Sequence, residues 1–270
     1  MAWSERQQAM LREMGIRLWQ PPTAPEAPSS VPPAPAATAA TVVTRTADTA
    51  RAEPPAALPA PRPPVAAAPA VIARRPSAVD RMDWPALREA VATCRACSLC
   101  ERRQQTVFGV GHEQARWMLI GEAPGEQEDL QGEPFVGKAG QLLDAMLATL
   151  SLTRSEASAE QQVYIANVLK CRPPHNRNPE PQEVAQCEPF LKRQVELVKP
   201  RLIVAMGRFA VQSLLQTQEP IGRLRGRVHH YEGVPVVVTY HPAYLLRNPL
   251  DKARSWDDLC LAREVYERGG

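Results

Sequence analysis

The sequence predicts an α/β fold, a three-layer αβα sandwich around a central, mostly parallel sheet of four strands. Short apolar runs of strand length alternate with amphipathic segments of helix length over the last two thirds of the chain. These apolar runs are nearly continuous rather than alternating, which is typical of strands buried on both faces of a parallel sheet. This part of the chain is also long enough to bury a core of its own.

The expected elements follow in order along this part of the chain. Residues 84–94 carry apolar side chains at helical spacing, and residues 117–120 form a short apolar run that ends at Gly121. Residues 138–150 place leucines and a methionine on one side of an amphipathic helix. The remaining elements are strands over 163–169, 202–206 and 234–240 and helices over 181–198, 209–215 and 251–268.

The first third of the chain has a different composition. Between residues 21 and 80, 34 of 60 positions are proline or alanine and none is aromatic. Such a segment buries too little apolar surface to offset its chain entropy, so we expect a disordered linker over 21–82. The chain then divides into a short apolar peptide or helix over 1–20, this linker, and a globular domain over 83–270.

Charge and hydropathy indicate the cellular location of the protein more than its function. The net charge is +3, which neither requires nor excludes a nucleic-acid partner. No run of 18 apolar residues exists that could span a membrane, and the N-terminus lacks the pattern of a secretory signal. We therefore expect a cytoplasmic protein, in the bacterial cytosol or nucleoid. Cysteines there serve as thiols or metal ligands more often than as disulfides.

Four cysteines have a spacing that suits a metal centre. Cys94 and Cys97 are two residues apart and can reach one metal from a single turn. Cys171 and Cys187 could supply a second pair, and Cys100 is a further candidate. Four thiolates suit either zinc or an iron–sulfur cluster, and spacing alone does not choose between them. Unrelated buried cysteines are the alternative interpretation.

Chemically distinctive residues follow three of the predicted strands. Gly121, Glu122 and Ala123 come after the first strand, Asn167 closes the next, and His241 follows the last. Ligands of such sheets bind beyond the carboxyl ends of the strands, where these residues lie. Each one alone also has a structural explanation, as a solvated loop, a turn former or a His-Pro loop. Their coincidence at one sheet edge favours a functional site.

Four longer segments surround these residues: GEAPGEQED, GEPFVGKAGQLLD, NVLKCRPPHNRNP and HPAYLLRNP. Together with the preceding Cys-x-x-Cys pair they resemble the family 4 uracil-DNA glycosylases, the iron–sulfur branch of the uracil-DNA glycosylase superfamily. The resemblance covers about residues 84–267. It implies hydrolysis of the N-glycosidic bond of deoxyuridine in DNA, which releases uracil and leaves an abasic site. It also implies a [4Fe–4S] cluster rather than zinc, with these ligands: Cys94, Cys97, Cys171 and Cys187.

The resemblance also suggests roles for single residues around the base. Phe135 would stack on the extruded uracil, and Asn167 would match the O4 and N3 edge of uracil while mispairing with cytosine. His241, as a neutral donor on the O2 side, would stabilise the negative charge that develops on uracil. Gly121 and Ala123 belong to the same substrate site.

A carboxylate would stabilise the cationic sugar and orient water. Glu122 is the first candidate for this role and Glu128 the second. Family 1 enzymes carry an aspartate where this chain has Ala123, and a tyrosine that excludes thymine where it has Gly125. The water-activating scheme of family 1 therefore cannot be transferred to this chain.

The last motif resembles the wedge with which the family fills the gap left by the extruded base. Leu245 and Leu246 would enter the duplex, and Arg247 would meet phosphate. Other basic residues could contact the DNA backbone or form ordinary solvated surface: Lys170, Arg172, Arg177, Arg223, Arg225, Arg227, His229 and His230.

Two alternative functions stay open at this point. One is a module that binds or senses uracil in DNA without turnover. The other is a glycosylase of a sister branch that stays covalently bound to its product through a histidine. That branch carries an added basic loop, whereas this chain has only His175 near the corresponding place.

Residues 1–20 fall outside the family resemblance. They end in an apolar string, and the pattern LREMGIRLWQ is similar to the N-terminal peptide of the psi subunit of the bacterial clamp loader. An apolar peptide on a long tether is a good docking motif. We expect a monomer that binds uracil-containing DNA, with a replication protein, an unknown partner, or the catalytic domain itself as the target of this peptide.

Overall fold

The computed structural model describes residues 10, 13 and 78–269. Their strands are β1 (Val110–Gly111), β2 (Trp117–Gly121), β3 (Tyr164–Asn167), β4 (Leu202–Met206), β5 (Val228–Tyr231) and β6 (Val234–Thr239). Their longer helices are α2 (Trp84–Ala92), α4 (Gly137–Ala148), α5 (Pro181–Val198), α6 (Arg208–Leu215) and α9 (Lys252–Arg268). Shorter helices are α3 (Glu126–Gln131), α7 (Ile221–Leu224) and α8 (Pro242–Arg247), with 3₁₀ turns η1 (Val79–Arg81), η2 (Ser98–Glu101), η3 (Pro174–Asn176) and η4 (Pro249–Asp251).

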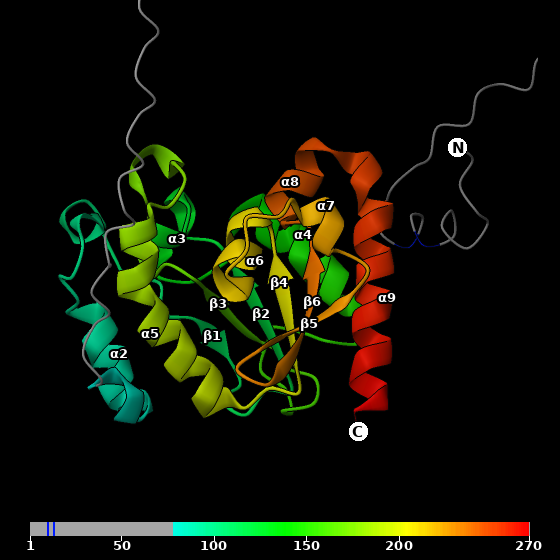
Figure 1. Cartoon of the computed structure of the whole chain (residues 1–270), viewed down its shortest axis with the longest axis horizontal. Coiled ribbons are helices and arrows are strands. Elements are labelled where there is room, and N and C mark those ends of the chain that lie inside the picture. The colour runs from blue at the N-terminus through cyan, green and yellow to red at the C-terminus, as the bar shows by residue number, and fades with distance from the viewer. Residues whose placement is uncertain (1–9, 11–12, 14–77, 270) are drawn as a thin grey trace, which may run out of the picture. The chain divides into compact units, whose positions relative to one another are not determined.

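The strands form one six-stranded sheet in the order β1-β3-β2-β4-β6-β5 (Figure 1). The central four, β3, β2, β4 and β6, are parallel and are the four strands that the sequence predicts. The structure adds an antiparallel strand at each edge, β1 and β5. Sequence analysis missed both because β1 has only two residues and β5 reads Val-His-His-Tyr, with no apolar run.

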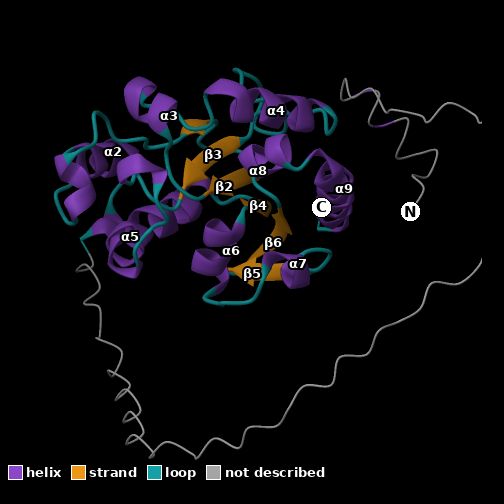
Figure 2. Cartoon of the chain, turned by 90° about the horizontal axis from the view of Figure 1, so that it is seen from above, coloured by secondary structure: helices purple, strands orange, loops and turns teal. Residues whose placement is uncertain are grey.

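Alternate side chains of the strands enter two separate cores, as the pleat of a sheet requires. Met118 and Ile120 of β2 join the apolar side chains of α5 and α6, whereas Trp117 and Leu119 join those of α4 and α9. Figure 2 shows α5 and α6 on one side of the strands and α4 and α9 on the other. The predicted three-layer αβα sandwich is confirmed.

The parallel register brings the carboxyl ends of the strands together. Gly121 at the end of β2 lies opposite Asn167 at the end of β3, and Met206 of β4 lies opposite Thr239 of β6. The residues that follow these strands therefore meet at one edge of the sheet. The short helices α3 and α8 begin there, a few residues beyond β2 and β6.

The N-terminal boundary differs from the prediction. Val79 is 3% exposed and packs with Leu87, Val91 and Phe190, so residues assigned to the linker already belong to the folded domain. The rest of the predicted linker and the predicted docking peptide lie outside the described residues, apart from Met10 and Glu13. In the part of the chain that is described, no helix is long and apolar enough to cross a membrane.

Candidate active site

A small cavity lies at the carboxyl ends of the strands. It is open to solvent on one side, spans about 220 Å³ including that opening, and brings together residues that are far apart in the sequence. Its lining consists of Ala123, Gly125, Glu128, Phe135, Asn167 and His241. The structure thus unites side chains from all three strand ends that the sequence singles out. We call this space the base cavity.

Phe135 is held in an uncommon backbone conformation. Its φ is +54°, and its main-chain oxygen accepts a hydrogen bond from Nη1 of Arg154 at 2.9 Å. A Cβ on Gly140 would come within 1.7 Å of the same oxygen, so α4 can pack this closely only with glycine there. The aromatic ring is 4% exposed and stacks on His241 with a centroid distance of 5.1 Å. The surrounding contacts therefore fix the ring on one wall of the cavity.

Gly121 explains how Phe135 and Asn167 approach each other. A Cβ at this position would lie 2.4 Å from Oδ1 of Asn167 and 2.7 Å from Cζ of Phe135. Any larger residue would push the two side chains out of the cavity. The contribution of Gly121 to the site is the space that it leaves.

Asn167 carries an unusual polar atom. The residue closes β3 and is 2% exposed, and its Oδ1 is buried without a hydrogen-bond partner among the described residues. Buried polar atoms are nearly always paired, and an orphan in a cavity wall is what a bound ligand would satisfy. Asn167 therefore has free acceptor capacity where a base would lie.

His241 is set up as a neutral donor. It caps the N-terminus of α8, where its Nδ1 accepts a hydrogen bond from the backbone N–H of Ala243 at 3.2 Å. The proton of the neutral ring then lies on Nε2. Burial lowers the pKa of His241 to about 4, and the nearby Arg247 acts in the same direction. The imidazole is thus uncharged at neutral pH.

The two candidate carboxylates occupy different environments. Glu128 lines the base cavity, but its Oε2 accepts a hydrogen bond from the backbone N–H of Gly125, the N-cap residue of α3, at 3.0 Å. Glu122 lines a wider cleft that adjoins the cavity and also contains His241. Burial raises the pKa of Glu122 to about 7, and the positive charge of Arg208 opposes that rise. Glu128 has a local structural role, whereas Glu122 is available for chemistry.

Arg208 is a site residue that sequence analysis missed. It follows Gly207 directly after β4, and its guanidinium lies 4.3 Å from the ring centroid of Phe209. Its side chain lines the cleft shared by Glu122 and His241. The signal was present, because β4 is a fourth parallel strand whose carboxyl end reaches the same edge. The prediction covers three strand ends and omits this fourth one.

The helix α8 places the two leucines of the proposed wedge in different environments. Leu245 is 1% exposed and packs in the core with α4 and α9, whereas Leu246 is 44% exposed. Successive residues of a helix point about 100° apart, so α8 turns one leucine inward and the next outward. Assigning Leu245 to a DNA contact is inconsistent with this burial. Leu246 and Arg247 are exposed and stay available.

Several basic residues that could contact DNA or form solvated surface are instead bonded within the protein. Lys170 is buried, and Arg177 pairs with both carboxylate oxygens of Glu183, at 2.6 and 2.9 Å. His229 contacts the main-chain oxygen of Leu224 at 2.8 Å.

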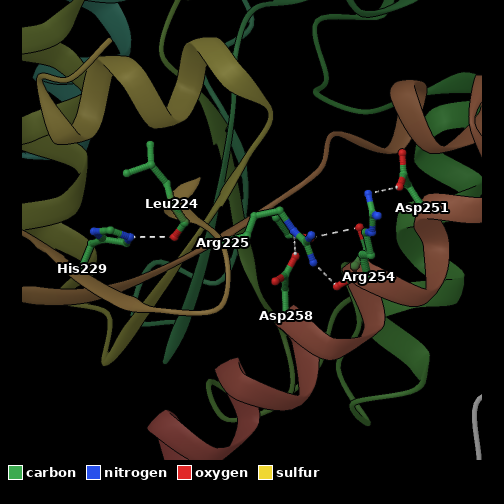
Figure 3. Close-up of polar contacts among 8 residues, drawn as sticks. Leu224, Arg225, His229, Asp251, Arg254 and Asp258 are labelled. Carbon is green, nitrogen blue, oxygen red and sulfur yellow. Dashed lines mark hydrogen bonds and ion pairs between the residues drawn. The ribbon is translucent and has the colours of Figure 1, made fainter. Parts of the chain in front are cut away.

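Arg225 is another basic residue that is bonded within the protein, and its contacts support the active site (Figure 3). Its Nε donates to Asp258 of α9 at 2.6 Å, and its guanidinium lies 4.6 Å from the ring centroid of Tyr240. Tyr240 stacks in turn on Tyr244 of α8. Arg225 therefore braces the segment that carries His241.

Comparison with known proteins decides the family. Residues 108–261, more than half of the chain, match the family model described as Uracil DNA glycosylase superfamily. The chain is 46% identical to the type-4 uracil-DNA glycosylase of Archaeoglobus fulgidus, over 59% of this chain and 81% of that protein. It is 42% identical to the type-4 uracil-DNA glycosylase of Thermotoga maritima, over 67% and 94%. The chain belongs to the uracil-DNA glycosylase superfamily, on its type-4 branch.

The type-5 branch is more distant. The type-5 uracil-DNA glycosylase of Thermus thermophilus is 32% identical, over 47% of this chain and 72% of that protein. The family resemblance read from the motifs is therefore confirmed at the level of the branch.

The four cysteines of this type-4 family member lie close together. Cys171 and Cys187 are buried around Leu99 and Leu169, with Cys97 packed against them. Cys94 and Cys97 both act electrostatically on the Cys171 thiol. All six cysteines of the chain are described, and none forms a disulfide. The thiols thus form one group, which we call the cysteine centre.

The donor set of the cysteine centre suits an iron–sulfur cluster. Burial raises the pKa of the Cys187 thiol to about 12, so this thiol would become a thiolate only if bound cations compensated its charge. Nη1 of Arg103 donates to Sγ of Cys171 at 3.1 Å, and the backbone N–H of Lys170 donates to Cys187. Such hydrogen bonds to sulfur are typical of iron–sulfur sites.

Among the described residues, no group of three or more His, Cys, Asp or Glu side chains is arranged to hold a single metal ion. The four thiols suit either a cluster or zinc, as their spacing in the sequence does.

Proposed function

We propose that this protein is a monofunctional DNA glycosylase that hydrolyses the N-glycosidic bond of deoxyuridine, releasing uracil and leaving an abasic site for base excision repair. The observation that carries the proposal is the base cavity, where Phe135, Asn167 and His241 meet. The bond is out of reach in a stacked duplex, so the nucleotide must be extruded into a pocket of this kind. The type-4 relatives, named uracil-DNA glycosylases, support the same activity.

The buried walls of the base cavity would recognise uracil. Phe135 offers a flat apolar face for stacking, and Asn167 offers an amide whose Oδ1 lacks a protein partner. An amide can accept from N3–H of uracil and donate to O4 at the same time. Cytosine presents an acceptor and a donor at these positions, so the same amide would be mismatched.

Cleavage of the bond separates a negative from a positive charge, and the site has a group that can stabilise each. The uracil leaves as an anion, which Nε2–H of the neutral His241 stabilises from the O2 side. The sugar becomes cationic, and the carboxylate of Glu122 stabilises it and orients the attacking water. Arg208 keeps more of Glu122 ionised and, with Arg247, gives the cleft positive charge for the DNA backbone. Leu246 fills the gap that the extruded base leaves.

The cysteine centre would hold a [4Fe–4S] cluster on Cys94, Cys97, Cys171 and Cys187. Bound there, a cluster supplies a structural crosslink rather than a step of the reaction. The centre joins the end of α2 and the segment after β3 to α5. It would thereby fix the segment after β3, which begins next to Asn167, and support Ala123, which lines the base cavity.

Residues 1–20 would dock the enzyme on a replication protein, with the bacterial clamp loader as the candidate. The enzyme would then act as a monomer in the bacterial cytosol or nucleoid, where its DNA substrate lies. The basis for this part of the proposal is the apolar string that ends at Trp19, followed by the Pro/Ala-rich segment.

The proposal is tested with oligonucleotides that contain one uracil. Wild-type protein should release free uracil and leave an alkali-labile site, with no product from the matching thymine oligonucleotide. Glu122→Gln should lower turnover by at least about a hundredfold, the scale of losing one electrostatic stabiliser. If Glu122→Gln stays within a few-fold of wild type, the role passes to Glu128.

A denaturing gel of the same reaction separates the alternative functions. Free abasic product indicates turnover, whereas a protein–DNA adduct indicates the sister branch that stays bound. The exposed His175 does not line the base cavity, which favours turnover. Binding without cleavage would identify a sensing module.

A further inference from the structure

Lys170 is a buried ionisable residue that the proposed mechanism leaves without a role. It is 1% exposed, and lysine is almost never buried this fully without partners. Its Nζ donates to the main-chain oxygen of Asn167 at 2.8 Å and to Oε1 of Gln194 at 2.6 Å. The side chain therefore joins the end of β3 to the inner face of α5.

Gln194 is itself fixed by other parts of the fold. It is fully buried, and its Nε2 donates to the main-chain oxygen of Phe108 at 2.9 Å and to Oη of Tyr164 at 3.2 Å. Tyr164 is the first residue of β3 and Asn167 the last. The network therefore holds both ends of the strand that presents the base-reading amide.

The anchor of this network shares a helix face with the cysteine centre. Cys187 and Gln194 are seven residues apart on α5, about two turns, so both point toward the segment after β3. Lys170 contacts Cys187 through its backbone and Asn167 through its side chain. Ala123 packs on the cysteine centre and also lines the base cavity. The centre and the cavity are thus separated by a single layer of residues.

We propose that Lys170 is a positioning residue for base recognition, which fixes the main chain of Asn167 so that its amide faces the base cavity. A buried carbonyl without a donor is costly, so losing the Lys170 bond would let the end of β3 move to find another partner. Displacing a recognition group by about 1 Å can lower a rate by about a hundredfold. This inference rests on the proposed uracil excision and on the contact assigned there to Asn167.

The test is a double-mutant cycle in the full-length protein, read as single-turnover excision of uracil. Lys170→Met, close to isosteric, should lower the rate at least about tenfold because Asn167 is no longer held. In an Asn167→Ala background the same change should alter the rate by less than about twofold, since its effect passes through Asn167. Gln194→Met should show a smaller loss with the same dependence on Asn167.

Three further measurements separate positioning from general damage. Iron content and binding to an oligonucleotide with an abasic-site analogue should stay near wild type, because the abasic analogue lacks the base that Asn167 reads. The melting temperature should fall by the few degrees that unpaired buried acceptors cost, and by the same amount in the Asn167→Ala background. Lys192→Met is the matched control: unlike Lys170, this lysine lies on α5 with its side chain 38% exposed, pairs with Glu232 at 3.1 Å, and its substitution should leave the rate unchanged.

Several outcomes would overturn the inference. These are a wild-type rate for Lys170→Met, additive losses in the double mutant, or a loss of iron in both the Lys170 and Gln194 variants that matches their loss of rate. If Lys170→Met does not fold, the cycle with Gln194→Met decides. If wild-type protein leaves uracil in the DNA, the proposed function itself fails, and the two failures are distinguishable.

Discussion

At the scale of single residues, burial shifts the pKa values of Glu122 and His241 in opposite directions. Burial raises the pKa of the Glu122 carboxyl to about 7 and lowers the pKa of the His241 imidazole to about 4. Near neutral pH the histidine is therefore uncharged, whereas the carboxyl group is close to its midpoint. The same burial thus gives a neutral donor on the uracil side and a titrating carboxylate beside the sugar.

This difference predicts the pH dependence of the reaction. Glu122 acts as a carboxylate, so kcat/KM should rise through about pH 7 and reach a plateau above it, while His241 adds no step above pH 5. Arg208 favours the ionised carboxylate, so Arg208→Gln should move the rise to higher pH. Initial rates at low substrate concentration between pH 5.5 and 9 measure both profiles. A flat wild-type profile, or one that Arg208→Gln does not move, would contradict the role of Glu122.

Asn167 gives a second prediction at this scale. Asn167→Asp should impair uracil removal because a carboxylate cannot donate a hydrogen bond to O4 of uracil. The buried site would in addition hold a group that prefers to be charged. Excision rates on uracil oligonucleotides measure the effect, with the melting temperature as the control for folding. Unchanged kinetics on uracil would refute the base contact.

At the scale of secondary-structure elements, the helix α8 gives two adjacent leucines different roles, one in packing and the other in DNA contact. Leu245→Ala should lower the free energy of unfolding by about 2–5 kcal/mol, since it empties a buried position. Leu246→Ala should change that free energy by no more than about 0.5 kcal/mol but weaken excision from duplex DNA. Thermal unfolding and excision assays on both variants test this division. Equal stability losses, or full duplex activity in Leu246→Ala, would contradict it.

The elements also show where prediction from the sequence succeeds. The four central strands and α5 could be read from the sequence because continuous apolar runs and helical periodicity report burial directly. The helix α8 has six residues and starts with proline, so its sequence shows too little periodicity to predict that Leu245 points inward. Arg225 looks like solvated surface in sequence, and its partner Asp258 lies 33 residues away. Contacts between distant residues, unlike periodicity, leave no local signal.

At the scale of the whole molecule, the cysteine centre ties three parts of the chain together. It joins the turn after α2, the segment after β3 and the helix α5, which are up to 93 residues apart. The proposed cluster would crosslink these parts, and its binding energy would add to the free energy of folding. The centre should therefore contribute strongly to stability, although it performs no step of the reaction.

The metal prediction follows from this arrangement. Purified protein should be brown, with broad absorption near about 400 nm and about four irons per chain. Cys171→Ser should lose the colour and lower the melting temperature, whereas Cys260→Ser, in α9, should keep both. Iron analysis and thermal unfolding measure the two effects. A colourless protein with stoichiometric zinc would contradict the cluster assignment.

The remaining prediction concerns the N-terminal third of the chain. The active-site residues proposed above all lie between positions 94 and 247, and the family match begins at residue 108. Deleting residues 1–77 should therefore leave the excision rate on short oligonucleotides within about twofold of the full-length protein, because no such residue is removed. The same deletion should abolish capture of clamp-loader subunits in a pulldown.

Trp19→Ala in the full-length chain provides the sharper form of this test. A large aromatic side chain is the kind of residue that dominates the energy of a short docking peptide. The substitution should remove most of the capture while leaving both the excision rate and the melting temperature unchanged. A tether raises the local concentration of the enzyme near its partner, so the benefit should appear only when partner and DNA are present together. The docking proposal is wrong if the full-length protein captures no replication subunit, or if the deletion unfolds the catalytic domain.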